Sequence, residues 1–287
     1  MCRILVLFGG SQPISRYRDA LIESLLRASE FDPYGGFLTG SRGISHRDGW
    51  GRLSVLITSR GVEKLSIAKS IEPFYNDIDA RAHPHQLGSR DGAAVEMIHV
   101  RAAATGMPIN IFSTHPAEAV TSEGYRLYLI HNGTVDKNRI LEDLGIDGRG
   151  VYASLYNDTY FLAQMIATRI RSHIDEGILR EIIGYTVSAL NIGAILVRER
   201  DVEVVVGSFY KVYDRAVERR NYYKIYRAVS SEPVYIYSSS TTIDIYRPDL
   251  DLEWIEIPNG LFEAYRIWYD GSPRVEKRFE TIILGDG

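Results

Sequence analysis

The chain of 287 residues has a formal net charge of −4 and 45% hydrophobic residues, an ordinary balance for a soluble globular protein with a substantial core. Its 33 basic residues form no long run and are outnumbered by 37 acidic ones, which argues against a nucleic-acid partner. No apolar stretch approaches the roughly 20 residues that span a bilayer, and the short apolar run at the start leads us to expect no secretory signal. One cysteine excludes an intramolecular disulfide and a zinc site of several thiolates, so we expect a cytoplasmic protein without membrane contact.

The first half of the sequence contains short apolar runs and one clear helical pattern. Residues 2–8 are almost wholly apolar and predict a buried strand, whereas residues 15–30 carry the apolar stripe of an amphipathic helix. The stretch 60–95 is the least regular part and is expected to form a long surface excursion. Further strands are expected over residues 51–59, 93–101 and 125–135.

The second half turns first to helices and then to strands. Helical patterns cover residues 136–145, 157–174 and 177–190, and Asp136 is a candidate N-cap of the first. From Asn191 onward, β-branched and aromatic runs separated by Gly, Asp and Pro predict strands. Runs of strands, then helices, then strands indicate an α+β protein with antiparallel sheets and a helical layer. Since no linker or repeat divides the chain, residues 1–287 are expected to form a single domain.

The position of the lone cysteine, Cys2, suggests a chemical role. Initiator methionine is commonly removed before a small residue, and loss of Met1 would leave a free α-amine on the same residue as the thiol. The ordinary pKa values of the two groups are about 8 and 8.5, so the amine can take the thiol proton at neutral pH. Cys2 would then supply both nucleophile and base. The plainer alternative is a small buried apolar residue.

Four later stretches carry polar residues where strands or helices begin or end. Each has an ordinary structural explanation, because Asn-Gly favours a hairpin turn, Asn or Asp caps helices, and an arginine at a strand end often faces solvent. The stretches contain Gly49-Trp50-Gly51, His99 and Arg101, His131-Asn132-Gly133, and Asp158 at the head of the helix over 157–174.

Taken together and in this order, the motifs resemble the class II glutamine amidotransferase domain of the N-terminal nucleophile hydrolases, in its stand-alone amidotransferase-like branch. Members of that branch begin Met-Cys and then carry H-x-D-G-W-G, H-x-R-x-A, H-N-G and [S/N]-D-T. The resemblance covers nearly the whole chain and implies a four-layer αββα sandwich with two facing antiparallel sheets. The motifs lie at Met1-Cys2, His46 to Gly51, His99 to Arg101, His131 to Gly133 and Asn157 to Thr159.

The resemblance also implies a role for each motif residue. Arg101 would grip the α-carboxylate of a glutamine substrate, which suits a planar guanidinium. Asp158 would pair with the α-ammonium group. Attack by Cys2 on the side-chain amide makes an oxyanion, for which the side chain of Asn132 and the backbone N–H of Gly133 would be donors. Loss of ammonia leaves a γ-glutamyl thioester that water hydrolyses to glutamate.

The sequence departs from the family pattern next to the arginine. Many relatives have an aromatic residue directly after it and a threonine three places after it, whereas here Ala102 follows and the threonine is Thr105. Thr105 is therefore expected as a displaced substrate contact, and the small Ala102 leaves room for a γ-glutamyl compound larger than glutamine. The resemblance implies that three further residues support the site from behind the substrate contacts: His99, Trp50 and His115. For His115, a purely structural role is the alternative.

These steps need neither a metal nor an organic cofactor, and we expect none. His83 and His85 flank a proline with no cysteine and no obvious third ligand, so they do not predict a metal site.

The resulting hypothesis is a glutaminase-type amidotransferase that acts on a small-molecule substrate, glutamine or a γ-glutamyl amide. Because the chain has no P-loop or dinucleotide motif, a separate synthase subunit would have to accept the ammonia, or the protein simply hydrolyses its substrate. The alternatives are a hydrolase of γ-glutamyl peptides or conjugates, and a catalytically silent relative that binds a ligand or protein partner. A homo-oligomer stays open.

Overall fold

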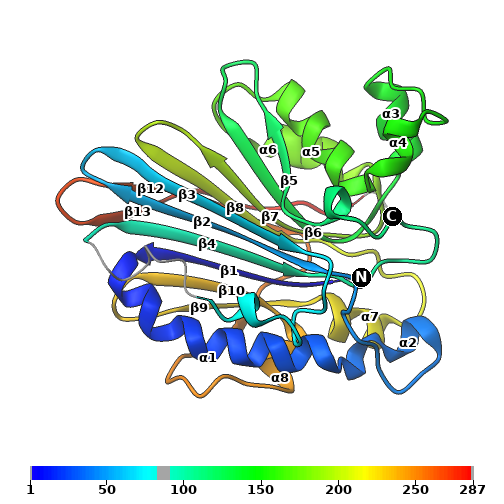
Figure 1. Ribbon diagram of the computed structural model, residues 1–287, viewed down its shortest axis with the longest axis horizontal. Coiled ribbons are helices and arrows are strands. Elements are labelled where there is room, and N and C mark those ends of the chain that lie inside the picture. Colours follow the sequence, from blue (N-terminus) through cyan, green and yellow to red (C-terminus); the bar gives the residue numbers. More distant parts are fainter. Residues whose placement is uncertain (1, 83–90, 286–287) are drawn as a thin grey trace.

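Two antiparallel sheets face each other in the computed structural model, which describes residues 2–82 and 91–285 (Figure 1). Within this described part, the first sheet has seven strands in the order β11-β9-β10-β1-β4-β2-β3, and the second has six in the order β13-β12-β8-β7-β6-β5. The first comprises β1 (Arg3–Gly10), β2 (Trp50–Thr58), β3 (Gly61–Ser70), β4 (Ala93–Val100), β9 (Ile225–Val229), β10 (Val234–Ser239) and β11 (Ile255–Glu256). The second comprises β5 (Ala117–Val120), β6 (Arg126–Val135), β7 (Thr186–Val197), β8 (Asp201–Ser208), β12 (Leu261–Tyr269) and β13 (Pro273–Ile282).

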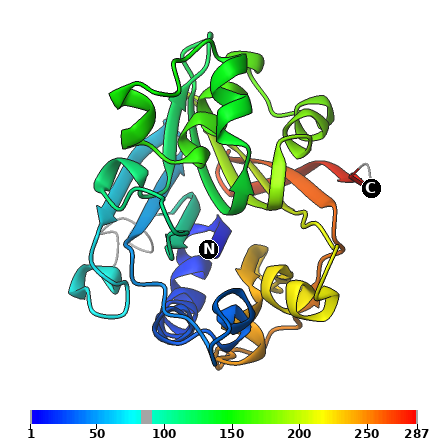
Figure 2. The ribbon, with the colours of Figure 1, turned by 90° about the vertical axis from the view of Figure 1, so that its right-hand side faces the viewer.

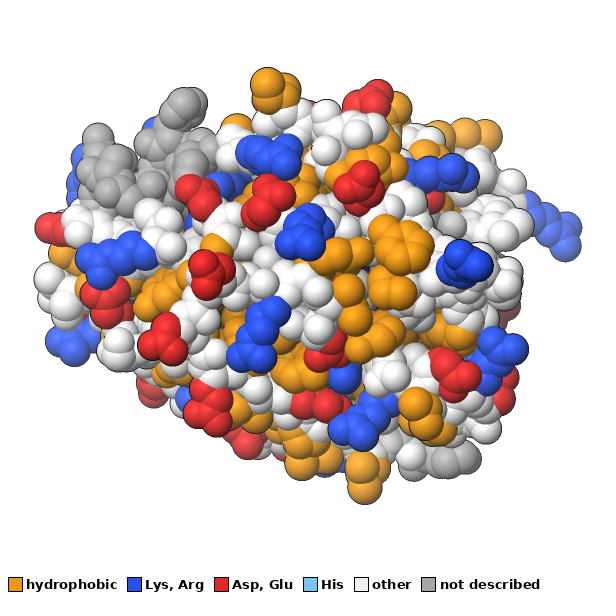
Figure 3. Space-filling model, turned by 90° about the horizontal axis from the view of Figure 1, so that it is seen from below, with side chains coloured by type: hydrophobic (Ala, Val, Ile, Leu, Met, Phe, Trp, Pro, Cys, Tyr) orange, Lys and Arg blue, Asp and Glu red, His pale blue; other side chains and the backbone are white. Residues whose placement is uncertain are grey.

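Helices cover the outer faces of both sheets. The long helix α1 (Ser11–Glu30) and the short α8 (Ser240–Asp244) lie on the first sheet, and α5 (Asp158–Arg169) and α6 (Glu176–Ile183) lie on the second (Figure 1). Figure 3 views the α1 layer from outside, where basic and acidic side chains are interspersed with apolar ones. Among the described residues, no helix has both the length and the apolar character needed to cross a bilayer. The remaining helices are α2 (Gly36–Thr39), α3 (Lys137–Asp143), α4 (Val151–Leu155) and α7 (Ala216–Tyr223).

The apolar run at the start of the chain explains why β1 lies at the centre of this arrangement. Successive side chains of a strand point to opposite faces. Ile4, Val6 and Phe8 therefore pack between the two sheets, while Leu5 and Leu7 pack beneath α1. A third apolar cluster fills the space between the second sheet and α5 and α6. The αββα sandwich with facing antiparallel sheets is confirmed.

Three of the expected elements differ in the structure, and one is the helix expected over 157–174, which ends at Arg169. Residues 61–70, expected within a surface excursion, form the edge strand β3, whose half-exposed faces carry charged side chains and obscure the period-two pattern. The helix expected over 177–190 ends at Ile183, and strand β7 begins at Thr186. Gly184 and Tyr185 separate the two elements, and the β-branched residues after them favour a strand. His83 and His85 lie outside the described residues.

One end of the sandwich gathers the motif residues. In the sheet register, Val100 on β4 lies between Arg3 on β1 and Trp50 on β2. The residues next to these three, Cys2, Gly49 and Arg101, therefore meet at the same edge, and the N–H of Arg101 donates to the carbonyl of Gly49. Figure 2 looks onto this end of the molecule, with the start of β1 near the middle of the view.

Candidate active site

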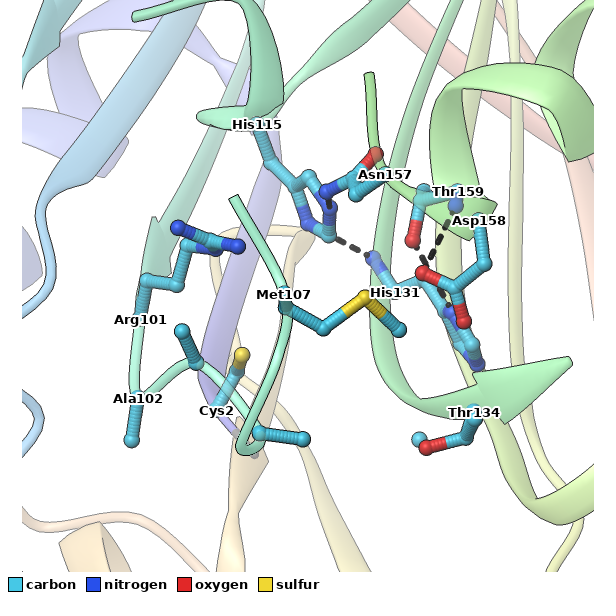
Figure 4. A pocket seen from close by; sticks show the side chains of 13 residues that line it. Cys2, Arg101, Ala102, Met107, His115, His131, Thr134, Asn157, Asp158 and Thr159 are labelled. Carbon is cyan, nitrogen blue, oxygen red and sulfur yellow. Dashed lines mark hydrogen bonds between the residues drawn. The ribbon is translucent and has the colours of Figure 1, made fainter. Parts of the chain in front are cut away.

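A small cavity at this end brings together four segments: the residue before β1, the loop after β4, the end of β6 and the start of α5 (Figure 4). Its volume is about 30 Å³, enough for a water but far less than the roughly 300 Å³ or more of usual small-molecule sites. The Met107 side chain points across the cavity toward His131, so a larger substrate requires this side chain to move (Figure 4). The lining consists of Cys2, Arg101, Ala102, Ala103, Ala104, Met107, His115, His131, Gly133, Thr134, Asn157, Asp158 and Thr159.

Cys2 is held to the opposite sheet by its main chain. Its nitrogen donates a hydrogen bond of 2.9 Å to Oδ1 of Asn132, which lies on β6. Both residues are buried, and Nδ2 of Asn132 finds no hydrogen-bond partner within the described part of the chain. An unmet buried donor carries a free-energy cost, so Nδ2 is an amide group ready to bind an acceptor beside Cys2.

The surroundings of Cys2 favour its thiolate form. Burial alone would raise the pKa of the thiol, but the positive charge of the amino terminus, His99 and Arg101 together hold that pKa well below its ordinary value. Nε2 of His99 lies 3.1 Å from the carbonyl oxygen of His131. Since a carbonyl only accepts, Nε2 of His99 is the donor in this contact. Nδ1 of His99 is buried, and a hydrogen bond between the His99 and Cys2 side chains also lowers the pKa of the thiol.

Gly133 occupies a position that only glycine fits. Its φ is +151°, and a Cβ there would lie 2.0 Å from the carbonyl oxygen of Ala189 on the neighbouring strand. The pairing of β6 with β7 shifts register between Gly133 and Val135. Such an irregularity bends the strand locally, and the two residues at this point, Gly133 and Thr134, line the Cys2 cavity.

Arg101 lines the cavity, and part of its guanidinium group has no hydrogen-bond partner in the described residues. The side chain is 3% exposed, and Nη2 donates to the carbonyl oxygen of Pro108 at 2.8 Å. Nη1 is buried without a hydrogen-bond partner in the described residues. A buried guanidinium is normally paired, so this side chain has the charge and the free donor to bind an anion.

Asp158 presents the opposite charge on the other side of the same cavity (Figure 4). It is the first residue of α5, whose N-cap is the side chain of Asn157. Its carboxylate is 5% exposed and accepts from the backbone N–H groups of Thr159 at 2.9 Å and Val135 at 3.0 Å. No cation forms an ion pair with it in the described part, so Asp158 supplies a negative charge to the cavity.

Two histidines support the wall between these charges. His131 is fixed by Thr159 Oγ1 at Nδ1 and by the carbonyl oxygen of Ala189 at Nε2. His115 packs its ring 3.9 Å from that of His99 and accepts a hydrogen bond from the Asn157 amide. Burial lowers the pKa of both rings, and neighbouring positive groups lower that of His115 further. Neutral imidazoles in these positions orient their neighbours.

Two expected site residues lie away from the Cys2 cavity. Trp50 packs against Phe74 in the core beneath α1, where its indole N–H donates to Asp77. The motif glycine next to it has a closer link to the site, because a Cβ on Gly51 would lie 1.8 Å from the carbonyl oxygen of His115. Thr105 lines a neighbouring cavity and not that of Cys2.

Some of the cavity lining was not singled out by the sequence motifs. Met107 lies in an irregular segment and Thr134 has no distinctive spacing of its own, whereas Thr159 ends the motif Asn157 to Thr159 but had no role assigned to it. For Met107 and Thr134 the available signal was their proximity in sequence to Arg101 and Gly133. The described residues contain no group of three or more His, Cys, Asp or Glu side chains arranged to hold a metal.

Comparison with known proteins identifies similar folds. No family model matches the sequence, and no curated protein matches it. Glutamine phosphoribosylpyrophosphate amidotransferase from B. subtilis, complexed with ADP and GMP, is similar in structure with a TM-score of 0.53 at 16% identity, over 98% of this chain and 50% of that chain. The structure of the allosteric regulatory enzyme of purine biosynthesis has a TM-score of 0.50 at 15% identity, over 96% of this chain and 49% of that one.

The likeness shows the fold. The chain has the fold of an amidotransferase structure and spans about half the length of these two proteins. The alignment with a predicted glutamine amidotransferase from Pseudomonas aeruginosa PA01 covers 95% of this chain and 98% of that chain at 14% identity. Its TM-score is only 0.37.

Proposed function

We propose that this protein is a glutamine amidotransferase-type hydrolase that cleaves the side-chain amide of glutamine, or a γ-glutamyl amide, through a thioester on Cys2. Residues 1–287 would form one amidotransferase domain. The observation that carries the proposal is the Asn132 side chain, whose Oδ1 accepts from the Cys2 nitrogen while its buried Nδ2 stays free beside the nucleophile.

The two unpaired charges of the cavity suit the free end of an amino acid. A glutamine α-carboxylate would meet the free Nη1 of Arg101, and its α-ammonium group would meet Asp158. Both side chains are nearly fully buried, so binding the zwitterion supplies the partners that these groups lack. This pairing would select a substrate with a free α-amino acid end and direct its side chain to Cys2.

The proposed reaction proceeds in two steps. After removal of Met1, the α-amine of Cys2 takes the thiol proton, and the thiolate attacks the amide carbon. The oxyanion would accept from Nδ2 of Asn132 and the N–H of Gly133, two donors whose preorganisation lowers the barrier. The C–N bond breaks, the nitrogen takes up the proton and leaves as ammonia, and water then hydrolyses the thioester to glutamate and free Cys2.

The first experiment combines intact mass with ammonia release from glutamine. We expect a mass that lacks methionine, and we expect Cys2→Ala to abolish ammonia release. Full activity in Cys2→Ala, or in protein that retains Met1, contradicts the mechanism. If neither glutamine nor a γ-glutamyl amide is turned over but glutamine binds in calorimetry, the catalytically silent alternative replaces the proposal. Ammonia transfer to a synthase subunit would appear as activation of ammonia release by that partner.

A further inference from the structure

A second, larger cavity adjoins that of Cys2. It has a volume of about 570 Å³, within the usual range of small-molecule sites. The two cavities share the segment Ala102–Ala104 and no other lining residue. A group attached to the γ-carbonyl at Cys2 therefore has a neighbouring space that begins where the small side chains of this segment end.

The shared wall is fixed to the loop that forms the far side of the second cavity. The N–H of Asp48 donates to the carbonyl of Arg101 at 2.9 Å, and the N–H of Ala103 donates to Oδ2 of Asp48 at 2.7 Å. The N–H of Arg101 donates to the carbonyl of Gly49. Three hydrogen bonds thus hold Asp48 and Gly49 in a set position relative to Arg101, and hence relative to the Cys2 cavity.

The second cavity offers apolar surface and one free cation. Leu38 and Ile44 line it and are only half-buried, so they leave apolar area for a ligand. Arg47 also lines it, is exposed, and forms no ion pair within the described part of the chain. Asp48 is already engaged by the N–H of Ala103, which makes Arg47 the charged group that a ligand would meet first.

We propose that the second cavity binds the leaving group of a γ-glutamyl peptide, namely an amino acid residue linked through its nitrogen to the γ-carbonyl. The carboxylate of that residue pairs with Arg47, and an apolar side chain packs on Leu38 and Ile44. This inference rests on the proposed function and specifies its substrate class. A bulky residue at Ala102 would thicken the wall that the peptide must pass.

The chemistry is that of the proposed reaction with an amine in place of ammonia. The Cys2 thiolate attacks the γ-carbonyl carbon, the C–N bond breaks, and the nitrogen of the leaving amino acid takes the proton that the thiol gave up. Water then hydrolyses the thioester to glutamate and regenerates the thiol. No oxidant, reductant or further reactant is required.

The test compares two γ-glutamyl compounds that differ only in the group that Arg47 would bind. γ-Glutamyl-leucine carries the carboxylate, and γ-glutamyl-isopentylamide has the same side chain without it. We expect kcat/KM of the natural protein to favour γ-glutamyl-leucine by about two- to fivefold, the upper part of the range for an exposed ion pair. Arg47→Gln should remove this preference, whereas Arg42→Gln, a nearby exposed arginine outside the cavity lining, should retain it.

Binding of both compounds to the Cys2→Ala protein, measured by calorimetry, gives the same ratio without turnover. A ratio near one in the natural protein, or a ratio that Arg47→Gln leaves unchanged, overturns the inference. Hydrolysis of glutamine but not of γ-glutamyl-leucine also overturns it while the proposed function stands. If Cys2→Ala retains full activity, the proposed function fails, and the calorimetric ratio still decides whether Arg47 binds the carboxylate.

Discussion

The nitrogen of Cys2 and Oδ1 of Asn132 are joined by a hydrogen bond of 2.9 Å between residues 130 positions apart in the sequence. The bond links the central strand of one sheet to the facing sheet at the edge of the cavity. Because the bond engages Oδ1 of Asn132, it fixes the orientation of the whole amide group. The Nδ2 donor of that amide is therefore oriented by Cys2 itself. In the proposed reaction, this one side chain would align Cys2 and face the bond to be broken.

Replacement of Asn132 by alanine should lower kcat for glutamine hydrolysis by roughly 10²–10³, the usual cost of losing one oxyanion donor. KM should change far less, because the donor acts mainly on the charge that develops in the transition state. Asn132→Asp keeps the shape but replaces the Nδ2 donor with an acceptor, so it should be at least as damaging. Steady-state kinetics on both variants decide this, and a kcat within about threefold of the natural protein removes Asn132 from the mechanism.

Substitution of Arg101 by lysine should raise KM for glutamine by about tenfold or more, because an ammonium cannot reproduce the planar, two-donor contact with a carboxylate. The hydrogen bond to the Pro108 carbonyl gives a further reason, since lysine cannot easily serve both the loop and the substrate. Arg149→Lys, at an exposed position, is the matched control. An unchanged KM would show that the α-carboxylate binds elsewhere.

Alkylation of Cys2 by iodoacetamide should reach its half-maximal rate at a pH well below the ordinary thiol value of about 8.5. Burial opposes ionisation, but the charges of the amino terminus, His99 and Arg101 outweigh it and lower the pKa of the thiol. The alkylation rate of Cys2 should therefore remain high at pH values so low that the thiol of free N-acetylcysteine is already protonated. His99→Gln should move the midpoint upward, and a midpoint at or above that of N-acetylcysteine contradicts the assignment. Mass spectrometry of the labelled protein follows the rate.

The sequence predicted the layers of this fold because β1 is apolar on both faces and α1 on one, a pattern that central strands and covering helices require. It could not predict the edge strand β3, whose side chains face solvent as often as the core. Nor could it locate the boundary between α6 and β7, since the apolar residues around Tyr185 suit either element.

The site residues likewise divide into those that the sequence predicted and those that it could not. Cys2, Arg101, Gly133 and Asp158 line one cavity, as the order of the motifs suggested. Trp50 instead faces the core beneath α1, since a side chain within a motif takes the face that the strand alternation assigns to it. Met107 enters the cavity through the path of an irregular loop, and that path depends on contacts such as Arg101 with Pro108 that no local pattern reveals.

Acid should destabilise the protein through the buried cluster that anchors the residue after Cys2. Asp32 accepts from Arg3 at 2.5 Å, contacts Nε2 of His46 at 2.8 Å and accepts from Thr241 at 2.7 Å. Burial alone would raise the pKa of Asp32, but Arg3, His46 and Thr241 together lower it to about 2. An unfolded aspartate has a pKa near 3.9, so the folded state gains roughly 2–3 kcal/mol above pH 5.

Because the folded pKa is the lower one, this contribution should be lost as pH falls from about 5 to 2. Burial also lowers the pKa of His46, so protonation of that ring favours the unfolded chain at pH values below about 6.5 and acts in the same direction. Urea unfolding across pH 2–6 measures the free energy of unfolding of both proteins. Below pH 5, this free energy should change less with pH in Asp32→Asn than in the natural protein. At pH 6, Asp32→Asn should be the less stable of the two. The surface variant Asp147→Asn should retain the natural slope. Equal slopes in Asp32→Asn and the natural protein would show that Asp32 is not the group whose protonation opens this cluster.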